Sequence, residues 1–246
     1  LKIHKNNHIY RSINARLIIT NCSTPDDKYR KERSARIEKE RKLEALSRMG
    51  ALPEVVKTPK DNPQSSQKIE LGRLLFFDPI LSGGKDVACA TCHHPANGYA
   101  EFRDISIGVN GKGFGTRRAF NQPNNIPFVK RNVHTILNTA FNGINRWNQY
   151  TPEDAPMFWD IRIKSLEKQA LEPIKSFEEM RGIKYEENEI LIEVVARLKS
   201  ISEYREMFKS AFWGKENVTI ENLGKAIASF ERSLLASNSR FDLYMR

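Results

Sequence analysis

The chain has 246 residues, of which 39% are hydrophobic and 28% charged, a composition that argues against a disordered chain; no stretch approaches the roughly 20 apolar residues of a membrane span. Residues 1–48 hold 13 of the 40 lysines and arginines but only 6 of the 30 acidic residues, so most of the +10 net charge lies there. The nearly balanced remainder lacks the basic face of a nucleic-acid-binding domain, and three cysteines are too few for a disulfide framework.

The N-terminal part predicts little ordered structure. Residues 1–27 show no hydrophobic periodicity, 28–49 are densely charged and predict an exposed helix, and the proline-rich 53–65 predicts a linker. Residues 1–65 are therefore interpreted as a poorly ordered segment with one charged helix and a linker. The run ending at Cys22 resembles the end of a lipoprotein signal peptide, so export with a lipid anchor on Cys22 is an expectation.

The globular part is expected to begin at about residue 66. Ser66 is the predicted N-cap of a helix reaching Phe77, and Asp78-Pro79 would end it. Residues 94–130, rich in glycine, asparagine and proline, predict a long irregular loop of the kind that supports a cofactor. Helical periodicity returns at 164–171, 188–199 and 219–235, the last capped by Thr219. No alternating strand pattern is convincing, so the expected fold is mainly α with long irregular loops.

The segment Cys89-Ala90-Thr91-Cys92-His93 has the C-x-x-C-H form of c-type haem attachment. Two thiols at this spacing can each form a thioether with a haem vinyl group, and the next residue, His93, then binds the iron. A structural zinc site would need a second pair of ligands, and a thioredoxin-like redox pair would need a βαβ pattern; neither is present. Haem of this kind is attached outside the cytoplasm, so a periplasmic location is expected.

The sequence around this motif resembles the bacterial di-haem cytochrome c peroxidases and their relatives, the MauG-like methylamine-utilisation proteins. The resemblance runs from about residue 66 to the end in ordered blocks. These are Leu71–Pro79, Leu81–Gly83, the haem motif with Pro95, Ser106–Gly108, Arg131–Asn132 with Thr135, Leu137 and Asn138, Ala140–Asn142, Phe158–Asp160 with Arg162, Leu166, Gln169–Ala170, Pro173–Ile174, Glu179–Met180, Phe230–Arg232, Ser239 and Phe241–Asp242.

This resemblance implies that residues 66–246 are the N-terminal, peroxidatic domain of a two-domain enzyme with a cytochrome c-like fold. The family's second C-x-x-C-H motif is absent, and the sequence stops about where the linker to the second domain would begin. The chain is therefore expected to be a fragment that holds one covalent haem c of two. The implied reaction is reduction of hydrogen peroxide with electrons from a small cytochrome c or cupredoxin, and a homodimer is a further expectation.

The resemblance also implies roles for individual residues. His93 would be the proximal iron ligand, Glu179 the distal carboxylate that moves a proton, and Gln169 the distal amide that positions peroxide. Trp159 would lie between the two haems and aid electron transfer. Asn132 would help to hold a calcium ion, with the other ligands in the absent domain.

Two positions depart from the family pattern. Where some members have a histidine that caps the distal iron, this chain has Val109, which predicts an iron that is open or water-bound at rest. His134 stands where proline is common, and no function is assigned to it from the sequence.

Two alternatives stay open. A mono-haem electron carrier would need a distal methionine, for which Met157, Met180 and Met207 are the candidates. A protein-modifying di-haem oxidase of the methylamine-utilisation type would share Gln169, Glu179 and the non-histidine residue at 109. The sequence of this half does not separate that oxidase from a peroxidase.

Overall fold

A computed structural model of the chain describes residues 25–47, 50–145 and 147–246. The chain divides into two compact units, residues 1–49 and 50–246. The charged segment of the first unit forms α1 (Pro25–Ser47), whereas Cys22 lies outside the described residues. Among the described helices, none is long and apolar enough to cross a membrane.

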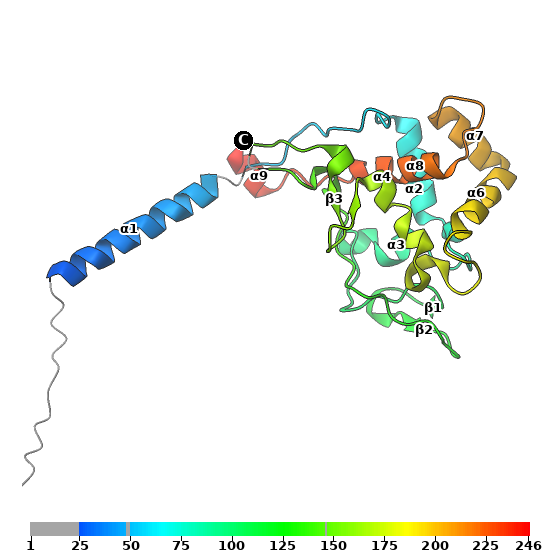
Figure 1. The fold of residues 1–246 in the computed structure, drawn as a ribbon, viewed down its shortest axis with the longest axis horizontal. Helices are drawn as coiled ribbons and strands as arrows, with labels where there is room; N and C mark the ends of the chain where they lie inside the picture. The colour runs from blue at the N-terminus through cyan, green and yellow to red at the C-terminus, as the bar shows by residue number, and fades with distance from the viewer. Residues whose placement is uncertain (1–24, 48–49, 146) are drawn as a thin grey trace, which may run out of the picture. The chain divides into compact units, whose positions relative to one another are not determined.

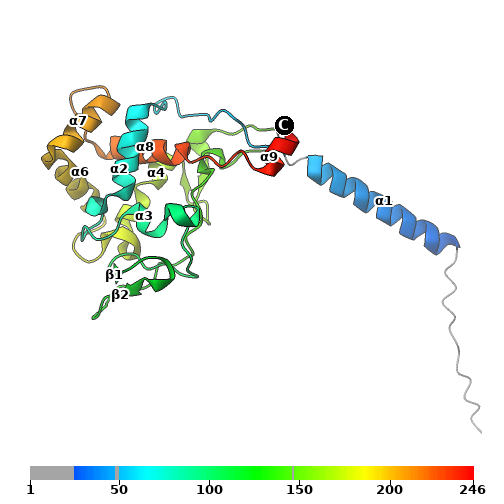
Figure 2. The ribbon, with the colours of Figure 1, turned by 180° about the vertical axis from the view of Figure 1, so that it is seen from behind.

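The second unit is mainly α, as predicted (Figures 1 and 2). Its longer helices are α2 (Ser66–Phe77), α6 (Ile190–Ser200), α7 (Ser202–Ala211) and α8 (Ile220–Ser233), and its short ones are α3 (Cys89–Cys92), α4 (Leu166–Gln169), α5 (Glu172–Lys175) and α9 (Arg240–Met245). The strands β1 (Gly111–Lys112) and β2 (Ala119–Phe120) pair antiparallel, as do β3 (Pro156–Met157) and β4 (Ile163–Lys164). Strands of two residues are too short to produce an alternating sequence pattern.

The core is organised where α2 crosses α8. Gly72 allows this close crossing, because a Cβ there would lie 2.0 Å from the Ala226 carbonyl oxygen. Thr219 caps α8 as predicted, but the N-cap of α2 is Ser65 rather than Ser66: the Ser65 hydroxyl accepts a hydrogen bond from the Lys68 amide.

Residues 53–65, which the sequence predicts to be a linker, belong to the compact second unit. Asn62 is fully buried, and its Nδ2 donates to Glu167 Oε1 (2.9 Å) and to the Lys225 carbonyl oxygen (3.1 Å). The Lys57 amide donates to the Tyr150 hydroxyl (2.7 Å). Prolines remove helical periodicity from this stretch, but they do not prevent an extended segment from packing against the rest of the unit.

Candidate functional site

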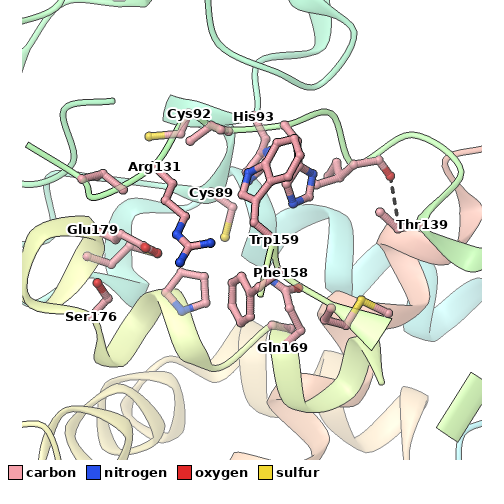
Figure 3. A pocket seen from close by; sticks show the side chains of 18 of the residues that line it. Cys89, Cys92, His93, Arg131, Thr139, Phe158, Trp159, Gln169, Ser176 and Glu179 are labelled. Atoms are coloured by element: carbon pink, nitrogen blue, oxygen red, sulfur yellow. Dashed lines mark hydrogen bonds between the residues drawn. The ribbon is translucent and has the colours of Figure 1, made fainter. Parts of the chain in front are cut away.

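The residues of the haem-attachment motif line a cavity of about 420 Å³ in the second unit, within the range of roughly 300–1,000 Å³ that is usual for ligand pockets. In Figure 3, Cys89, Cys92 and His93 lie along one side of this pocket, and Gln169, Ser176 and Glu179 lie across from them. Residues more than seventy positions apart in the sequence are thus brought together around one space.

The two cysteines occupy a single helical turn, α3, that the preceding loop holds in place. The His93 amide donates to the Cys89 carbonyl oxygen (2.9 Å), and the Ala88 amide donates to the Thr91 hydroxyl (3.0 Å). Both thiols are free and border the pocket. Burial raises the pKa of both thiols, that of Cys92 to about 12, so each is present as a neutral thiol.

His93 has the tautomer that an iron ligand needs. Its Nδ1 lies 3.0 Å from the Tyr99 carbonyl oxygen, and because a carbonyl oxygen can only accept, Nδ1 carries the proton and Nε2 keeps a free lone pair. Burial lowers the pKa of His93 to about 4, so the imidazole is neutral at physiological pH. Two thiols and a neutral imidazole at the wall of one cavity fit a covalently attached haem.

Glu179 projects from a π-helical turn, Phe177–Arg181, in which the Arg181 amide donates to the Ser176 carbonyl oxygen (3.0 Å). Such turns are frequent at functional sites. The Glu179 side chain is partly buried at the pocket wall, and this burial raises the pKa of its carboxyl group. A carboxyl group with a raised pKa keeps its proton to a higher pH than an ordinary glutamate, which suits it to taking up and releasing a proton during a reaction.

Two glycines hold this turn against the haem-attachment side of the unit. The Gly83 amide donates to the Met180 carbonyl oxygen (2.8 Å), and a Cβ on Gly108 would lie 2.1 Å from the Glu178 carbonyl oxygen. Loops on either side of the motif therefore fix the backbone that carries Glu179.

The other predicted residues are distributed between the pocket and its surroundings. Gln169 and Trp159 line the pocket, and Trp159 also reaches the surface with 61% of its area exposed. Val109 is instead buried in the core beside Gly182 and is not among the described lining residues. Asn132 lines the pocket, and its Nδ2 donates to the Arg103 carbonyl oxygen (2.6 Å). Among the described residues, no group of three or more histidine, cysteine and acidic side chains could hold a metal ion.

Sequence reasoning missed Glu231, which lines the pocket although it is buried. Its Oε2 has no hydrogen-bond partner among the described protein groups, and burial raises the pKa of its carboxyl group to about 8. The available signal was its position four residues after Ile227, on the apolar stripe of the predicted helix.

Sequence reasoning also assigned nothing to His134, which the structure places beside His93. Its ring centroid lies 6.3 Å from that of His93 and 5.7 Å from that of Trp159. No periodicity or motif marks this residue, because the contact joins three separate segments.

The family model of di-haem cytochrome c peroxidases matches residues 66–246, about three quarters of the chain. The chain belongs to the di-haem cytochrome c peroxidase family. The family name implies haem as the cofactor, and the cysteine pair and histidine of the pocket are the residues that fit it.

Similar proteins within this family carry both peroxidase and methylamine-utilisation names. The methylamine utilization protein MauG of Methylorubrum extorquens is 34% identical over 81% of this chain and 47% of its own length. The cytochrome c551 peroxidase of Pseudomonas aeruginosa is 34% identical over 79% of this chain and 47% of its own length. This chain thus spans about half the length of these relatives.

A solved structure supports the same family fold. The crystal structure of a MauG-like protein associated with microbial copper homeostasis aligns with 79% of this chain and 49% of its own, at a TM-score of 0.61 and 27% sequence identity. The resemblance again covers half of the larger protein.

Proposed function

We propose that residues 66–246 form the peroxidatic, cytochrome c-like haem domain of a di-haem enzyme that reduces hydrogen peroxide to water. One arrangement carries this proposal: a pair of free thiols and a neutral imidazole on one side of a cavity, with a carboxyl group of raised pKa and an amide across from them. Each of these groups has a place in peroxide reduction.

Cys89 and Cys92 would hold the haem through thioethers, and His93 Nε2 would bind its iron. When bound, the haem would supply the redox-active iron at which peroxide reacts and the route by which electrons reach it. Tyr99 fixes the His93 ring through the 3.0 Å contact with Nδ1, which orients Nε2 and increases its basicity toward a metal.

Glu179 and Gln169 act on the peroxide itself. The Glu179 carboxylate takes a proton from one peroxide oxygen and returns it to the oxygen that departs, so the O–O bond breaks without an unprotonated leaving group. The Gln169 amide has both donor and acceptor atoms and orients the peroxide for this transfer. Overall, hydrogen peroxide, two electrons and two protons give two molecules of water.

The proposal extends to the parts of the enzyme beyond this domain. Electrons arrive from a small cytochrome c or cupredoxin through a second haem domain, and Trp159 mediates their entry; its exposed indole supports this role. A periplasmic location follows from covalent haem attachment. A calcium ion held partly by Asn132, and a homodimer, complete the proposed assembly.

A protein-modifying oxidase is the second candidate. The 34% identity to MauG of Methylorubrum extorquens favours it, and the pocket residues Gln169 and Glu179 would serve that chemistry equally. A mono-haem electron carrier is the third candidate, because Met157 and Met180 both line the pocket and could supply a thioether ligand.

The test is to load the full chain with haem, confirm covalent attachment on a denaturing gel, and mix the ferric protein with hydrogen peroxide in a stopped-flow spectrometer. We expect a haem spectrum that changes with a rate proportional to peroxide concentration. The C89A/C92A double variant should lose covalent haem. A low-spin histidine–methionine spectrum that peroxide leaves unchanged would contradict the peroxidase and favour the carrier.

A further inference from the structure

His134 lies between the haem ligand and the surface. The His93–His134 and His134–Trp159 ring pairs have centroid distances of 6.3 and 5.7 Å and interplanar angles of 63° and 82°. Both pairs are edge-to-face contacts within the range of direct aromatic packing. The three rings thus form a continuous path from the pocket wall to an indole that is 61% exposed.

The backbone around His134 fixes this path at its inner end. The Tyr99 carbonyl oxygen accepts from His93 Nδ1 (3.0 Å) and also from the Ile136 amide (3.3 Å). The segment that carries His134 is therefore attached to the same carbonyl group that orients the proximal ligand. His134 Nδ1 in turn donates to the Thr135 carbonyl oxygen (2.7 Å), which sets the plane of its own ring.

The outer end of this path, Trp159, is held by the same segment that carries His134. Trp159 Nε1 donates to the Asn132 carbonyl oxygen (3.2 Å), two residues before His134. The backbone of residues 132–136 therefore fixes the positions of the Trp159 indole, the His134 imidazole and His93 relative to one another.

We propose that His134 places an aromatic ring between Trp159 and His93 so that electrons entering at the exposed indole reach the haem iron. This inference rests on the proposed function. For each transfer, a one-electron donor outside the chain is oxidised by one electron and the iron is reduced by one, with no net change in His134 or Trp159. Two transfers supply the electrons for one peroxide. His134 is a positioning residue, since it touches neither peroxide nor iron.

The experiment compares two replacements of His134 in the full, haem-loaded chain. Leucine in H134L removes the ring, and phenylalanine in H134F keeps an aromatic ring without the imidazole nitrogens. The anaerobic ferric protein is mixed with a small ferrous cytochrome c, and haem reduction is followed by stopped-flow absorbance. The reduction potential, the resting spectrum and the peroxide reaction rate are measured for each variant. H94L is the matched control, because the His94 ring packs against Phe114, 6.0 Å between centroids.

We expect H134L to be reduced several-fold more slowly than the unmodified chain, while H134F and H94L stay close to its rate and all potentials are unchanged. W159L should also be slow, and the H134L/W159L double variant should lose no more than the slower single variant, because steps on one path are not additive. Reduction of H134L at the unmodified rate would overturn the inference. A loss in H134F equal to that in H134L, with a shifted potential, would also overturn it, since His134 would then act only through the ligand.

The two proposals can fail separately. If peroxide leaves the haem spectrum unchanged in every variant, the peroxidase proposal is wrong, whereas the relay is still supported by slow reduction of H134L. If peroxide reacts normally and H134L is reduced normally, the relay is wrong and the peroxidase proposal stands.

Discussion

At the scale of single residues, adjacent glutamates on one turn have opposite environments. The pKa of Glu179 is raised because burial disfavours the charged carboxylate. Burial acts in the same direction on Glu178, but backbone hydrogen bonding and the 3.1 Å ion pair with Lys130 outweigh it, and the pKa of Glu178 is lowered. The two carboxyl groups therefore allow a controlled comparison.

E179Q should slow the reaction with hydrogen peroxide by about 10²–10⁴-fold, the usual contribution of a positioned general acid–base group. The amide keeps the size of the side chain but cannot accept the peroxide proton. The rate is measured by stopped-flow absorbance on the ferric haem protein. E178Q is the matched control and should retain the rate. Equal losses in the two variants would show that the turn, and not the Glu179 proton, is what matters.

The same carboxyl group predicts a pH dependence. Glu179 accepts a proton only when it is ionised, so the rate of the peroxide reaction should rise with pH as the group ionises, at a pH above its ordinary pKa of 4.5. E179Q should lack this rise. Because the folded-state pKa is raised, the folded protein binds the proton more tightly than the unfolded chain, and stability is lost as pH rises through this range. E179Q should consequently be no less stable than the unmodified chain at neutral pH, which thermal unfolding would check.

At the scale of elements, the Phe177–Arg181 turn that carries Glu179, here called the distal turn after the role proposed for Glu179, is positioned by close backbone packing. The Phe177–Arg181 turn contacts Gly108 so tightly that a Cβ there would lie 2.4 Å from the Glu179 carbonyl oxygen. The buried Arg118 holds the Gly108 loop from the other side, donating to the carbonyl oxygens of Ile107 (2.7 Å) and Gly108 (2.6 Å). The position of Glu179 therefore depends on a glycine about seventy residues earlier.

G108A should shift the distal turn and reduce both stability and peroxide reactivity. Forcing a methyl group against backbone atoms costs about 1–3 kcal/mol, and a displaced Glu179 should slow the peroxide reaction at least tenfold. Thermal unfolding and stopped-flow absorbance measure the two effects. G50A is the control, since a Cβ on Gly50 would meet nothing within 4 Å. A G108A protein with normal peroxide reactivity would show that the turn tolerates the shift.

At the scale of the whole molecule, the sequence predicted what local patterns encode. The apolar stripe of α8 and its Thr219 cap could be predicted because helix periodicity and capping are local. The C-x-x-C-H motif could be recognised because haem attachment requires a fixed spacing, and its role stays a prediction. Burial of Glu231 and the contacts of His134 were not readable, because they depend on how separate segments pack. The contacts of Asn62 with α4 and α8 were also not predictable, because the prolines around it give no sign of partners more than 100 residues away.

The unit Gly50–Arg246 contains every residue of the proposed site, so removal of residues 1–49 should leave the haem spectrum, the peroxide rate and the thermal stability unchanged. Removal of residues 1–65 should be different, because it deletes Asn62. Its Nδ2 donates to Glu167, which also pairs with the buried Arg232 at 2.7 Å, and its Oδ1 accepts from Lys68 Nζ at 3.1 Å.

Each buried polar group left without a partner costs about 1–3 kcal/mol. At roughly 2–4 °C per kcal/mol for a protein of this size, the shorter protein should therefore unfold several degrees lower. Thermal unfolding of the two haem-loaded truncations makes the comparison. Equal melting temperatures would mean that residues 53–65 act as the linker that the sequence predicts. A lower melting temperature after removal of residues 1–49 alone would mean that these residues stabilise the haem domain.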